Sequence, residues 1–159
     1  MFLQLIIRSA SAVLPVTMKT TKEKIGVNED IYSFTLPIGT VMNMDGAAIY
    51  LLASSIFIAG VYGISFTVSQ LMLAIFAVTI GSIGAASIPS AGLVILVIVL
   101  DILGLPGEGI LLVAGIDIIL DAMRSSVNVI GDMAGTTIIA STEENGLDRS
   151  ILYGKGQEA

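Results

Sequence analysis

The sequence predicts an all-α integral membrane protein, an inverted repeat of a re-entrant helical hairpin plus a transmembrane helix. Three observations support this fold class. The 159 residues are 55% hydrophobic and 13% charged, with a mean hydropathy of +0.95, whereas soluble domains carry about 25% charged residues. Two stretches of small residues each end in proline, RSASAVLP at 8–15 and SIGAASIP at 82–89. Between them, an apolar helix is interrupted by NMDG at 43–46.

The composition excludes several classes of function. The chain has no Cys, His or Trp, which removes thiol chemistry, disulfides and most zinc sites. A net charge of −6 argues against nucleic acid as a partner. No nucleophile–base pair stands out, so the sequence does not predict an enzyme or an organic cofactor.

Residues 1–25 are expected to form part of a first re-entrant hairpin and a cytoplasmic loop. The apolar run at 2–7 is short, is broken by Gln4 and lacks a basic flank, so it does not fit a signal peptide. We expect it to be the remainder of an element, in the C-terminal piece of a longer protein. Pro15 lacks a backbone donor and is expected to break the helix. The positive-inside rule places the following basic loop in the cytoplasm: Lys19, Lys22 and Lys24.

Residues 26–62 are predicted to form a broken transmembrane helix. Asn28 is placed to cap it, with Glu29 and Asp30 in its first turn. The NMDG stretch at 43–46 then puts polar groups and glycine at mid-membrane depth. Unwound backbone is tolerated there only where it lines a cavity enclosed by protein.

Residues 63–104 are predicted to form a second re-entrant hairpin that acts as a gate. Its apolar arms, 66–80 and 93–103, are too short to span a bilayer comfortably. The Gly/Ser-rich tip at 81–92 reads alternatively as a flexible linker, but its position between two apolar arms argues against that. Glycines permit hinge movement there.

Residues 105–141 are predicted to form a polar-striped transmembrane helix, running from about 110 to 140, and 142–159 a hydrophilic cytoplasmic tail. One whole helix separates the two hairpins, so they enter the membrane from opposite sides. Inverted repeats, a broken helix and polar groups at the midplane are typical of secondary transporters.

The striped helix carries the densest set of polar residues. At about 100° per residue, most of them fall within an arc of about 80°, with Ser125 just beside it. An alternative is the solvated face of a soluble helix, which the composition of the chain argues against. The stripe comprises Asp117, Asp121, Arg124, Ser125, Asn128 and Asp132.

These residue types favour binding over catalysis. Carboxylates of Asp45 and Asp132 with the amides of Asn43 and Asn128 supply the oxygen ligands that hard cations need; the alternative is a structural polar kink. A buried Arg124 is suited to a substrate carboxylate, and an Asp one turn away to an ammonium. The alternative for Arg124 is a structural salt bridge to Asp121.

Four ordered motifs carry a family resemblance across residues 8–141. RSASAVLPVTMKT, YSFTLPIGTVMNMDGAAIY, SIGAASIPSAG and DAMRSSVNVIGD closely resemble the dicarboxylate/amino acid:cation symporters, which include glutamate transporters and sodium–aspartate symporters. The resemblance implies sodium-driven uptake of glutamate or aspartate across a plasma or inner membrane. It also implies a multi-pass homotrimer whose transport domains move past a scaffold like elevators.

The resemblance implies roles for individual residues. Arg124 would bind the substrate's side-chain carboxylate, Asp121 its amino group with help from Ser125, and Asn128 its main-chain carboxylate. The surrounding backbone and the side chain nearest the distal carboxylate would complete the substrate site: Ser9, Ala10, Ser11, Ile88 and Ala47.

Sodium ions would occupy three sites by the same resemblance. The first would use the Gly39 carbonyl with Asn43, Asn128 and Asp132. The second would use backbone carbonyls close to Met44, namely those of Val41, Ser82, Ile83 and Ala85. The third would use Asn43 and Asp45 together with residues of an earlier helix.

Departures from the family pattern keep alternatives open. Ala47 stands where the family often has Thr, whose hydroxyl helps to hold the distal carboxylate, so the substrate is not fixed. Alternatives are C4-dicarboxylate transport, against which Asp121 argues mildly, and proton coupling. A different class of alternative is a truncated or scaffold-like subunit that does not transport, or an ion-conducting pore.

Overall fold

The apolar runs of the chain fold into helices, separated by breaks rich in glycine, asparagine and serine. The computed structural model describes residues 2–84 and 91–153, and every regular element in those ranges is helical. The all-helical part of the predicted fold class is therefore confirmed. In chain order the elements are α1 (Phe2–Ile7), α2 (Ala10–Thr20), the π-helix η1 (Thr21–Ile25), α3 (Glu29–Met42), α4 (Asp45–Val61), α5 (Val68–Gly84), α6 (Ala91–Ile102), the 3₁₀-helix η2 (Gly107–Ile110), α7 (Leu111–Ala114), α8 (Asp117–Thr142) and α9 (Arg149–Tyr153).

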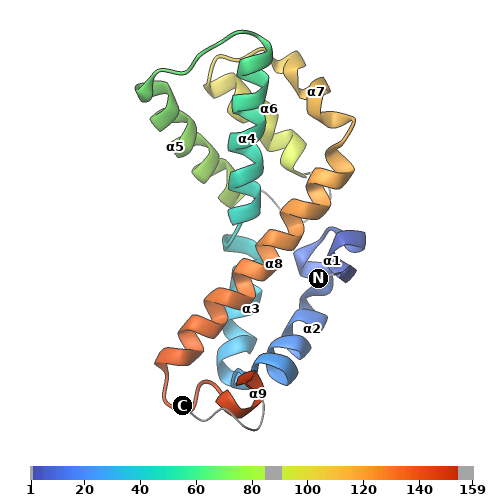
Figure 1. Ribbon diagram of the computed structural model, residues 1–159, viewed down its shortest axis with the longest axis vertical. Coiled ribbons are helices and arrows are strands. Elements are labelled where there is room, and N and C mark those ends of the chain that lie inside the picture. The colour runs from blue at the N-terminus through green and yellow to red at the C-terminus, as the bar shows by residue number, and fades with distance from the viewer. Residues whose placement is uncertain (1, 85–90, 154–159) are drawn as a thin grey trace.

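Helix α8 is the axis on which the other elements pack. Figure 1 shows α4 to α7 at one end of an elongated molecule and α2, α3 and α9 at the other, with α8 running between them. Its most extensive contacts are with α4 and α3, the two halves of the broken helix. Both halves of that helix therefore lie against the polar stripe.

The predicted interruption at NMDG is where the structure has it. Helix α3 ends at Met42, and Asn43, with φ −91° and ψ 93°, leaves the helical conformation before α4 begins at Asp45. Among the described residues, only the stretch Glu29–Val61 is long and apolar enough to cross a membrane, with a mean hydropathy of 1.7. Two shorter apolar helices accompany it, Val68–Ile83 and Ala91–Ile102.

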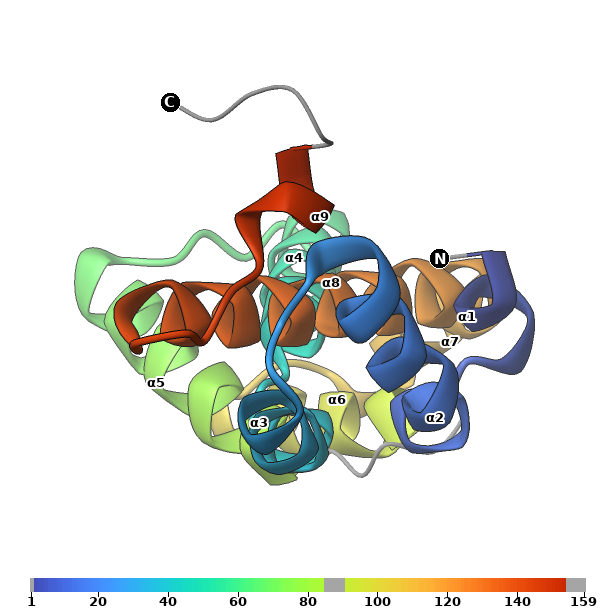
Figure 2. The same ribbon diagram turned by 90° about the horizontal axis from the view of Figure 1, so that it is seen from below.

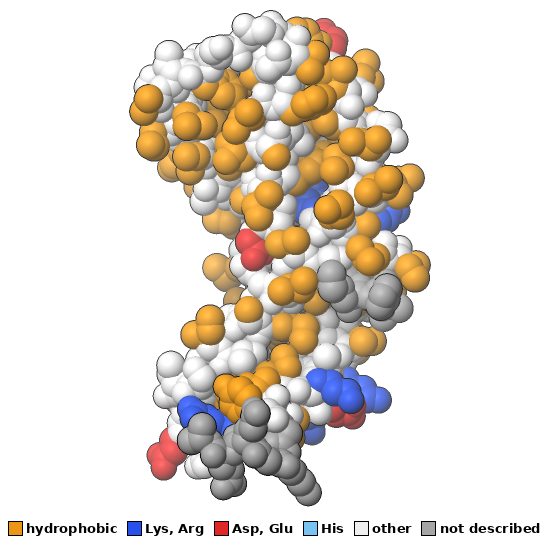
Figure 3. Space-filling view, in the orientation of Figure 1, with side chains coloured by type: hydrophobic (Ala, Val, Ile, Leu, Met, Phe, Trp, Pro, Cys, Tyr) orange, Lys and Arg blue, Asp and Glu red, His pale blue; other side chains and the backbone are white. Residues whose placement is uncertain are grey.

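The arms of the second hairpin pack against each other and against α4. A cluster of buried side chains joins the three helices: Leu51 and Ile58 of α4, Ala74 and Val78 of α5, and Leu96, Val99 and Leu100 of α6. The opposite faces of α5 and α6 expose apolar side chains such as Phe76 and Val94, and Figure 3 shows hydrophobic side chains over much of this end. Such a surface is suited to lipid or to another apolar helix. The tip at 85–90 lies outside the described residues, so the re-entrant turn stays a prediction.

The expectation that Pro15 breaks the first helix is wrong. Pro15 lies inside α2, and the break falls earlier, at Arg8 and Ser9. Arg8 has a left-handed φ of 56°, and the Ser9 side chain accepts a hydrogen bond of 3.3 Å from the Ala12 N–H. Buried Val13 anchors α2, so packing offsets the one hydrogen bond that proline removes.

The predicted start of the striped helix is also wrong. Instead of one helix from about 110, the chain forms η2, α7 and then a turn at Gly115 before α8 begins at Asp117. The Ile116 carbonyl accepts the first hydrogen bonds of α8, from the N–H groups of Ile119 (3.0 Å) and Leu120 (3.2 Å). The polar stripe therefore begins at the first residue of its helix.

The C-terminal tail is not simply an extended hydrophilic segment. After α8, residues 143–148 turn back, and α9 packs against η1. Figure 2, viewed from below, shows α9 beside the end of α2. The basic loop lies at this end, where Lys22 Nζ is 2.7 Å from Glu29 Oε2. This hydrogen bond raises the pKa of Lys22.

Candidate functional site

The polar stripe of α8 faces the protein interior. All six of its side chains are buried against α3, α4 and the first hairpin, which confirms that it is not a solvated face. The described residues hold no cluster of three acidic side chains close enough to ligate one metal ion. Any cation site here therefore has to combine one or two carboxylates with amide and backbone oxygens.

Asp121 is shared by two arginines. It is fully buried, and its Oδ1 accepts a hydrogen bond from Arg124 Nη2 one turn along α8. Its Oδ2 lies 3.3 Å from Nη1 of Arg8, which reaches in from the break between α1 and α2. The structural salt bridge considered for Arg124 is therefore present, and a second cation reinforces it.

Arg124 keeps one end of its guanidinium unpaired. Its Nη1 is buried and has no hydrogen-bond partner among the described residues. The Arg124 Cζ lies 5.1 Å from the centroid of the Tyr50 ring, a cation–π distance. Tyr50 is held in turn by donating to Asp117 Oδ1 at 3.2 Å. An oriented guanidinium with a spare N–H group fits a carboxylate, which accepts two parallel hydrogen bonds.

Two glycines make room for this arginine. A Cβ at Gly92, at the start of α6, would overlap Arg124 Nη1. A Cβ at Gly46, in the first turn of α4, would overlap the Arg124 carbonyl oxygen. Because neither glycine has a side chain, the gate arm and the broken helix both approach the site closely.

Asn128 connects the arginine to the lower part of the stripe. Its Oδ1 accepts a 2.8 Å hydrogen bond from the Gly46 N–H, and its Nδ2 donates to Met44 Sδ at 3.3 Å. Thioether sulfur is a weak acceptor, so a carboxylate would be a stronger partner for the same N–H group. Asn128 thus lies between the two halves of the stripe and contacts the break in the helix.

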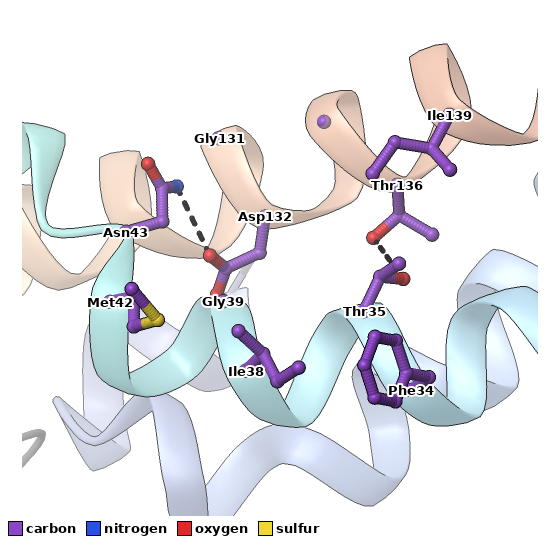
Figure 4. A pocket seen from close by; sticks show the side chains of 11 residues that line it. Phe34, Thr35, Ile38, Gly39, Met42, Asn43, Gly131, Asp132, Thr136 and Ile139 are labelled. Atoms are coloured by element: carbon purple, nitrogen blue, oxygen red, sulfur yellow. Dashed lines mark hydrogen bonds between the residues drawn. The ribbon is translucent and has the colours of Figure 1, made fainter.

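Asp132, like Arg124, has a buried polar atom without a hydrogen-bond partner among the described residues. Its Oδ1 accepts from Asn43 Nδ2 at 3.1 Å, while its buried Oδ2 has no partner among the described residues. Figure 4 shows Asp132 extending from α8 toward Gly39 and Asn43 on α3. A Cβ on Gly39 would lie 2.6 Å from Oδ1. A buried carboxylate oxygen beside helix-end backbone and an amide fits a small hard cation such as sodium.

Asp45 borders the same region from the other side of the break. A Cβ on Gly131 would overlap Asp45 Oδ2 and lie 2.6 Å from Asn43 Nδ2. Unlike Asp132, Asp45 is exposed in the described structure. It therefore stands at the rim of the polar cluster, open to a further element.

Comparison with known proteins is consistent with this geometry. The chain is 42% identical over 145 residues to excitatory amino acid transporter 3 of mouse, covering 91% of this chain and 28% of that protein. It is 41% identical over 140 residues to excitatory amino acid transporter 2 of human, covering 88% and 24% respectively, and to an excitatory amino acid transporter of Caenorhabditis elegans, covering 88% and 28%. The chain thus spans about a quarter of the length of these curated relatives. The model of the sodium:dicarboxylate symporter family matches residues 1–142.

The chain belongs to the sodium:dicarboxylate symporter family. The match covers both predicted hairpins, the broken helix and α8, and it ends where α8 ends. Membership in this family confirms the resemblance drawn from the four motifs and supports sodium as the coupling ion.

The structure brings many of the predicted site residues of this symporter family together. Asp121, Arg124 and Ser125 meet the first hairpin, where Ser125 Oγ donates to the Arg8 carbonyl at 3.4 Å. Ser9 caps α2 beside them, Ala10 is buried and Ser11 is exposed. Residues at the helix break form the second group, with Asn128 and Asp132: Gly39, Asn43 and Met44.

The other predicted residues are less closely placed. Ala47 is buried in an apolar cluster with Met44 and Ile95. Val41 and Ile83 have exposed side chains, while Ser82 is buried and donates to the Thr79 carbonyl at 2.9 Å. Two predicted residues, Ala85 and Ile88, lie outside the described residues. The second sodium site and the gate contact therefore stay predictions.

Sequence reasoning missed four residues that shape the site. Arg8, Tyr50, Gly46 and Gly92 lie far from α8 in the sequence, and only Arg8 carries a charge that would have drawn attention. A charged residue at the start of the serine-rich tip was a usable signal, because a lone arginine at membrane depth requires a partner. Gly46 lies in the predicted break, but the close approach that it and Gly92 allow to Arg124 gave no signal, since it depends on what packs against them.

Gly92→Ala is expected to weaken binding of an acidic ligand. The new methyl group would displace the Arg124 guanidinium; overpacking typically costs about 1–3 kcal/mol, or roughly five- to 150-fold in affinity. Gly60→Ala is the matched control, because a Cβ there meets nothing within 4 Å. Ligand titration of both variants tests this, and equal affinities would show that Arg124 does not depend on Gly92.

Proposed function

We propose that this chain forms the binding core of a sodium-coupled symporter for acidic amino acids, glutamate or aspartate. The observation that carries the proposal is the buried Arg124 guanidinium beside the shared Asp121 carboxylate, because its Nη1 has no hydrogen-bond partner in the part of the chain that the structure describes. Membership in the sodium:dicarboxylate symporter family supports it, as do relatives named as excitatory amino acid transporters.

Substrate binding proceeds by an exchange of partners. The substrate's side-chain carboxylate takes Arg124, and this releases part of Asp121 to accept the substrate ammonium. Arg8 stays with Asp121 and limits the cost of leaving a buried carboxylate without its arginine. Ser125 assists at the ammonium, and Asn128 exchanges Met44 Sδ for the main-chain carboxylate. Backbone of the two hairpin tips closes over the ligand, at Ser9, Ala10, Ser11 and Ile88.

Sodium binds at the lower half of the stripe. Asp132 Oδ2, Asn43, Asn128 and the Gly39 carbonyl hold one ion. Asn43 and Asp45 contribute to another, and a third uses carbonyls near Met44: Val41, Ser82, Ile83 and Ala85. Asn128 serves both substrate and ion, so the two binding events are linked through one side chain.

At its natural length the protein works as a homotrimer in a plasma or inner membrane. Each transport domain carries its ligands across in an elevator motion past a fixed scaffold. The units proposed within this chain are a partial hairpin (1–25), the broken helix (26–62), the gate hairpin (63–104), a unit (105–141) whose striped helix begins at Asp117, and a cytoplasmic tail (142–159).

A C4-dicarboxylate is the second candidate substrate, and one observation favours it. Asp121 is already paired with two arginines, so it does not require a substrate ammonium. The buried methyl group of Ala47 offers no hydroxyl to a distal carboxylate. Proton coupling and a non-transporting role for the chain on its own are the remaining alternatives.

Uptake of labelled aspartate, glutamate and succinate into vesicles distinguishes these candidates. The protein at its natural length is assayed with an inward sodium gradient, with equal sodium on both sides, and without sodium. We expect uptake of aspartate or glutamate that depends on the gradient. Uptake of succinate alone would favour the second candidate, sodium-independent uptake under a proton gradient would favour proton coupling, and no uptake of any substrate would contradict the proposal.

A further inference from the structure

The segment after α8 has no role in the function proposed above. Residues 145–153, here called the C-terminal clamp, lie beyond Thr142, which is both the last residue matched by the symporter family model and the last residue of α8. The clamp turns back onto the connection between η1 and α3, residues 26–28, which follows the first hairpin in the chain. Its contacts are therefore a feature of this chain beyond the family core.

Backbone hydrogen bonds join the clamp to that connection. Val27 and Leu147 form an isolated antiparallel bridge. The Asn28 N–H donates to the Gly146 carbonyl at 2.9 Å, and the Asp148 N–H donates to the Gly26 carbonyl at 2.8 Å. These bonds tie together two segments more than a hundred residues apart in sequence, so they add a tertiary constraint and not a local turn.

Gly26 allows the clamp to approach this closely. Its φ is +83°, a conformation that side chains disfavour, and a Cβ there would lie 2.5 Å from the Asp148 carbonyl oxygen and 3.0 Å from Ile151 Cβ. Both the Gly26 N–H and the Val27 N–H donate to the Thr21 carbonyl, at 3.0 and 3.3 Å. The turn that ends η1 is thus closed on one side and covered by the clamp on the other.

Apolar packing anchors the clamp in the core of this end. Leu147 packs on a cluster that joins α3 and α8: Val27, Tyr32, Leu36 and Ala140. Asp148 caps α9, accepting from the Ser150 N–H at 3.0 Å and its hydroxyl at 2.7 Å, and these bonds lower the pKa of Asp148. The clamp is therefore folded and anchored through Leu147, while Ile151 and Tyr153 of α9 stay exposed.

Helix α2 connects the clamped turn to the substrate site. It runs without interruption from its cap at Ser9 into η1, which ends at Ile25. At roughly 1.5 Å per residue, this path is on the order of 20 Å long. At the far end, Arg8 contacts Asp121 and its carbonyl accepts from Ser125. A shift at the base of α2 therefore moves groups that touch α8 at the site.

We infer that residues 145–153 are a positioning clamp, which fixes the base of α2 and thereby holds Arg8 and Ser9 against Asp121 and Ser125. Within the described ranges, no backbone hydrogen bond joins the turn before α5 to a distant segment of the chain. That turn is exposed, and a Cβ on Gly63, with φ +68°, would meet nothing within 4 Å. The turn before α5 therefore provides a reference turn for comparison with the clamped turn at Gly26.

Two variants remove the clamp by independent routes in the protein at its natural length. One ends the chain after Glu144, and the other is Gly26→Ala, whose methyl group would collide with Asp148. Gly63→Ala is the matched control, since it carries similar left-handed strain without any contact to lose. Hydrogen exchange then reports the stability of α2 and η1 directly, with no substrate present.

We expect both clamp variants to speed amide exchange across 10–25 by roughly tenfold or more, because several backbone hydrogen bonds are lost. Exchange in α5, at 68–84, stays unchanged, and Gly63→Ala leaves 10–25 at the native rate. Unchanged exchange across 10–25 in both clamp variants would overturn the inference. So would a uniform rise over the whole chain, since that indicates general destabilisation.

A second readout tests positioning, and it rests on the proposed function. Substrate affinity is expected to fall by roughly two- to thirtyfold in both clamp variants, the range over which remote positions modulate binding. Sodium affinity measured without substrate stays near the native value, because Asp132 on α8 and Asn43 after α3 lie about two helical turns from Ala140 and Leu36, where the clamp packs. Faster exchange with unchanged substrate affinity would overturn the positioning role, whereas a native protein that binds no acidic substrate would count against the proposed function only.

Discussion

Arg124→Ala is expected to lower the affinity for an acidic amino acid by roughly thirtyfold to several thousandfold. Truncating one member of a buried, hydrogen-bonded charge pair typically costs about 2–5 kcal/mol, and 1.4 kcal/mol is about tenfold in affinity. The expected loss arises from the ligand carboxylate, which would enter a buried site without its cation. Sodium binding in the absence of substrate should change little, since Asp132 lies two turns further along α8.

The design of this experiment depends on the second arginine. Arg8 lies 3.3 Å from Asp121 in the native structure, so we expect the fully buried carboxylate to keep one partner and the fold to persist in the variant. Arg124→Lys is the informative companion variant, because it keeps the positive charge but loses the planar guanidinium. Its affinity for the acidic ligand should lie between those of the native protein and Arg124→Ala. Equilibrium binding measures all three proteins. Native affinity in Arg124→Ala would remove Arg124 from the substrate site.

The large features of the fold follow from local sequence. The break between α3 and α4 was predictable because Asn43, Asp45 and Gly46 interrupt an otherwise apolar run, where helical and membrane preferences conflict. The predictions at Pro15 and near residue 110 failed for opposite reasons. Packing of α2 retained a helix that proline weakens. Near residue 110 the chain instead leaves the helix at Gly115 and Ile116, and the helical φ and ψ of Gly115, −65° and −23°, do not require a glycine there.

The candidate site was predictable on the striped helix and at the break between α3 and α4, but not beyond them. The spacing of polar residues from Asp117 to Asp132 identified the buried face of α8, because helical periodicity depends on one segment alone. The groups that complete the face come from three other elements: Arg8, Tyr50 and Gly92. No periodicity relates them to α8, and their roles appear only when the helices are packed.

Asp132→Asn is expected to weaken sodium binding by about thirtyfold or more, on the same basis of about 2 kcal/mol for a buried charged partner. The amide has nearly the shape of the carboxylate and can still accept from Asn43 Nδ2, which is 3.1 Å away. What it lacks is the negative charge of the unpartnered oxygen, the ligand that a hard cation prefers. Titration with sodium in the absence of substrate measures this directly.

Asp117→Asn provides the matched control on the same helix. Asp117 is also buried, but it accepts from the Tyr50 hydroxyl at the arginine end of the stripe, so its amide should leave sodium affinity near the native value. If Asn128 links the substrate and sodium sites, Asp132→Asn should also lower the affinity for substrate at moderate sodium concentrations. Saturating sodium should restore that affinity, because linkage is reciprocal. Substrate affinity that is independent of sodium in the native protein would contradict this coupling, whichever residue holds the ion.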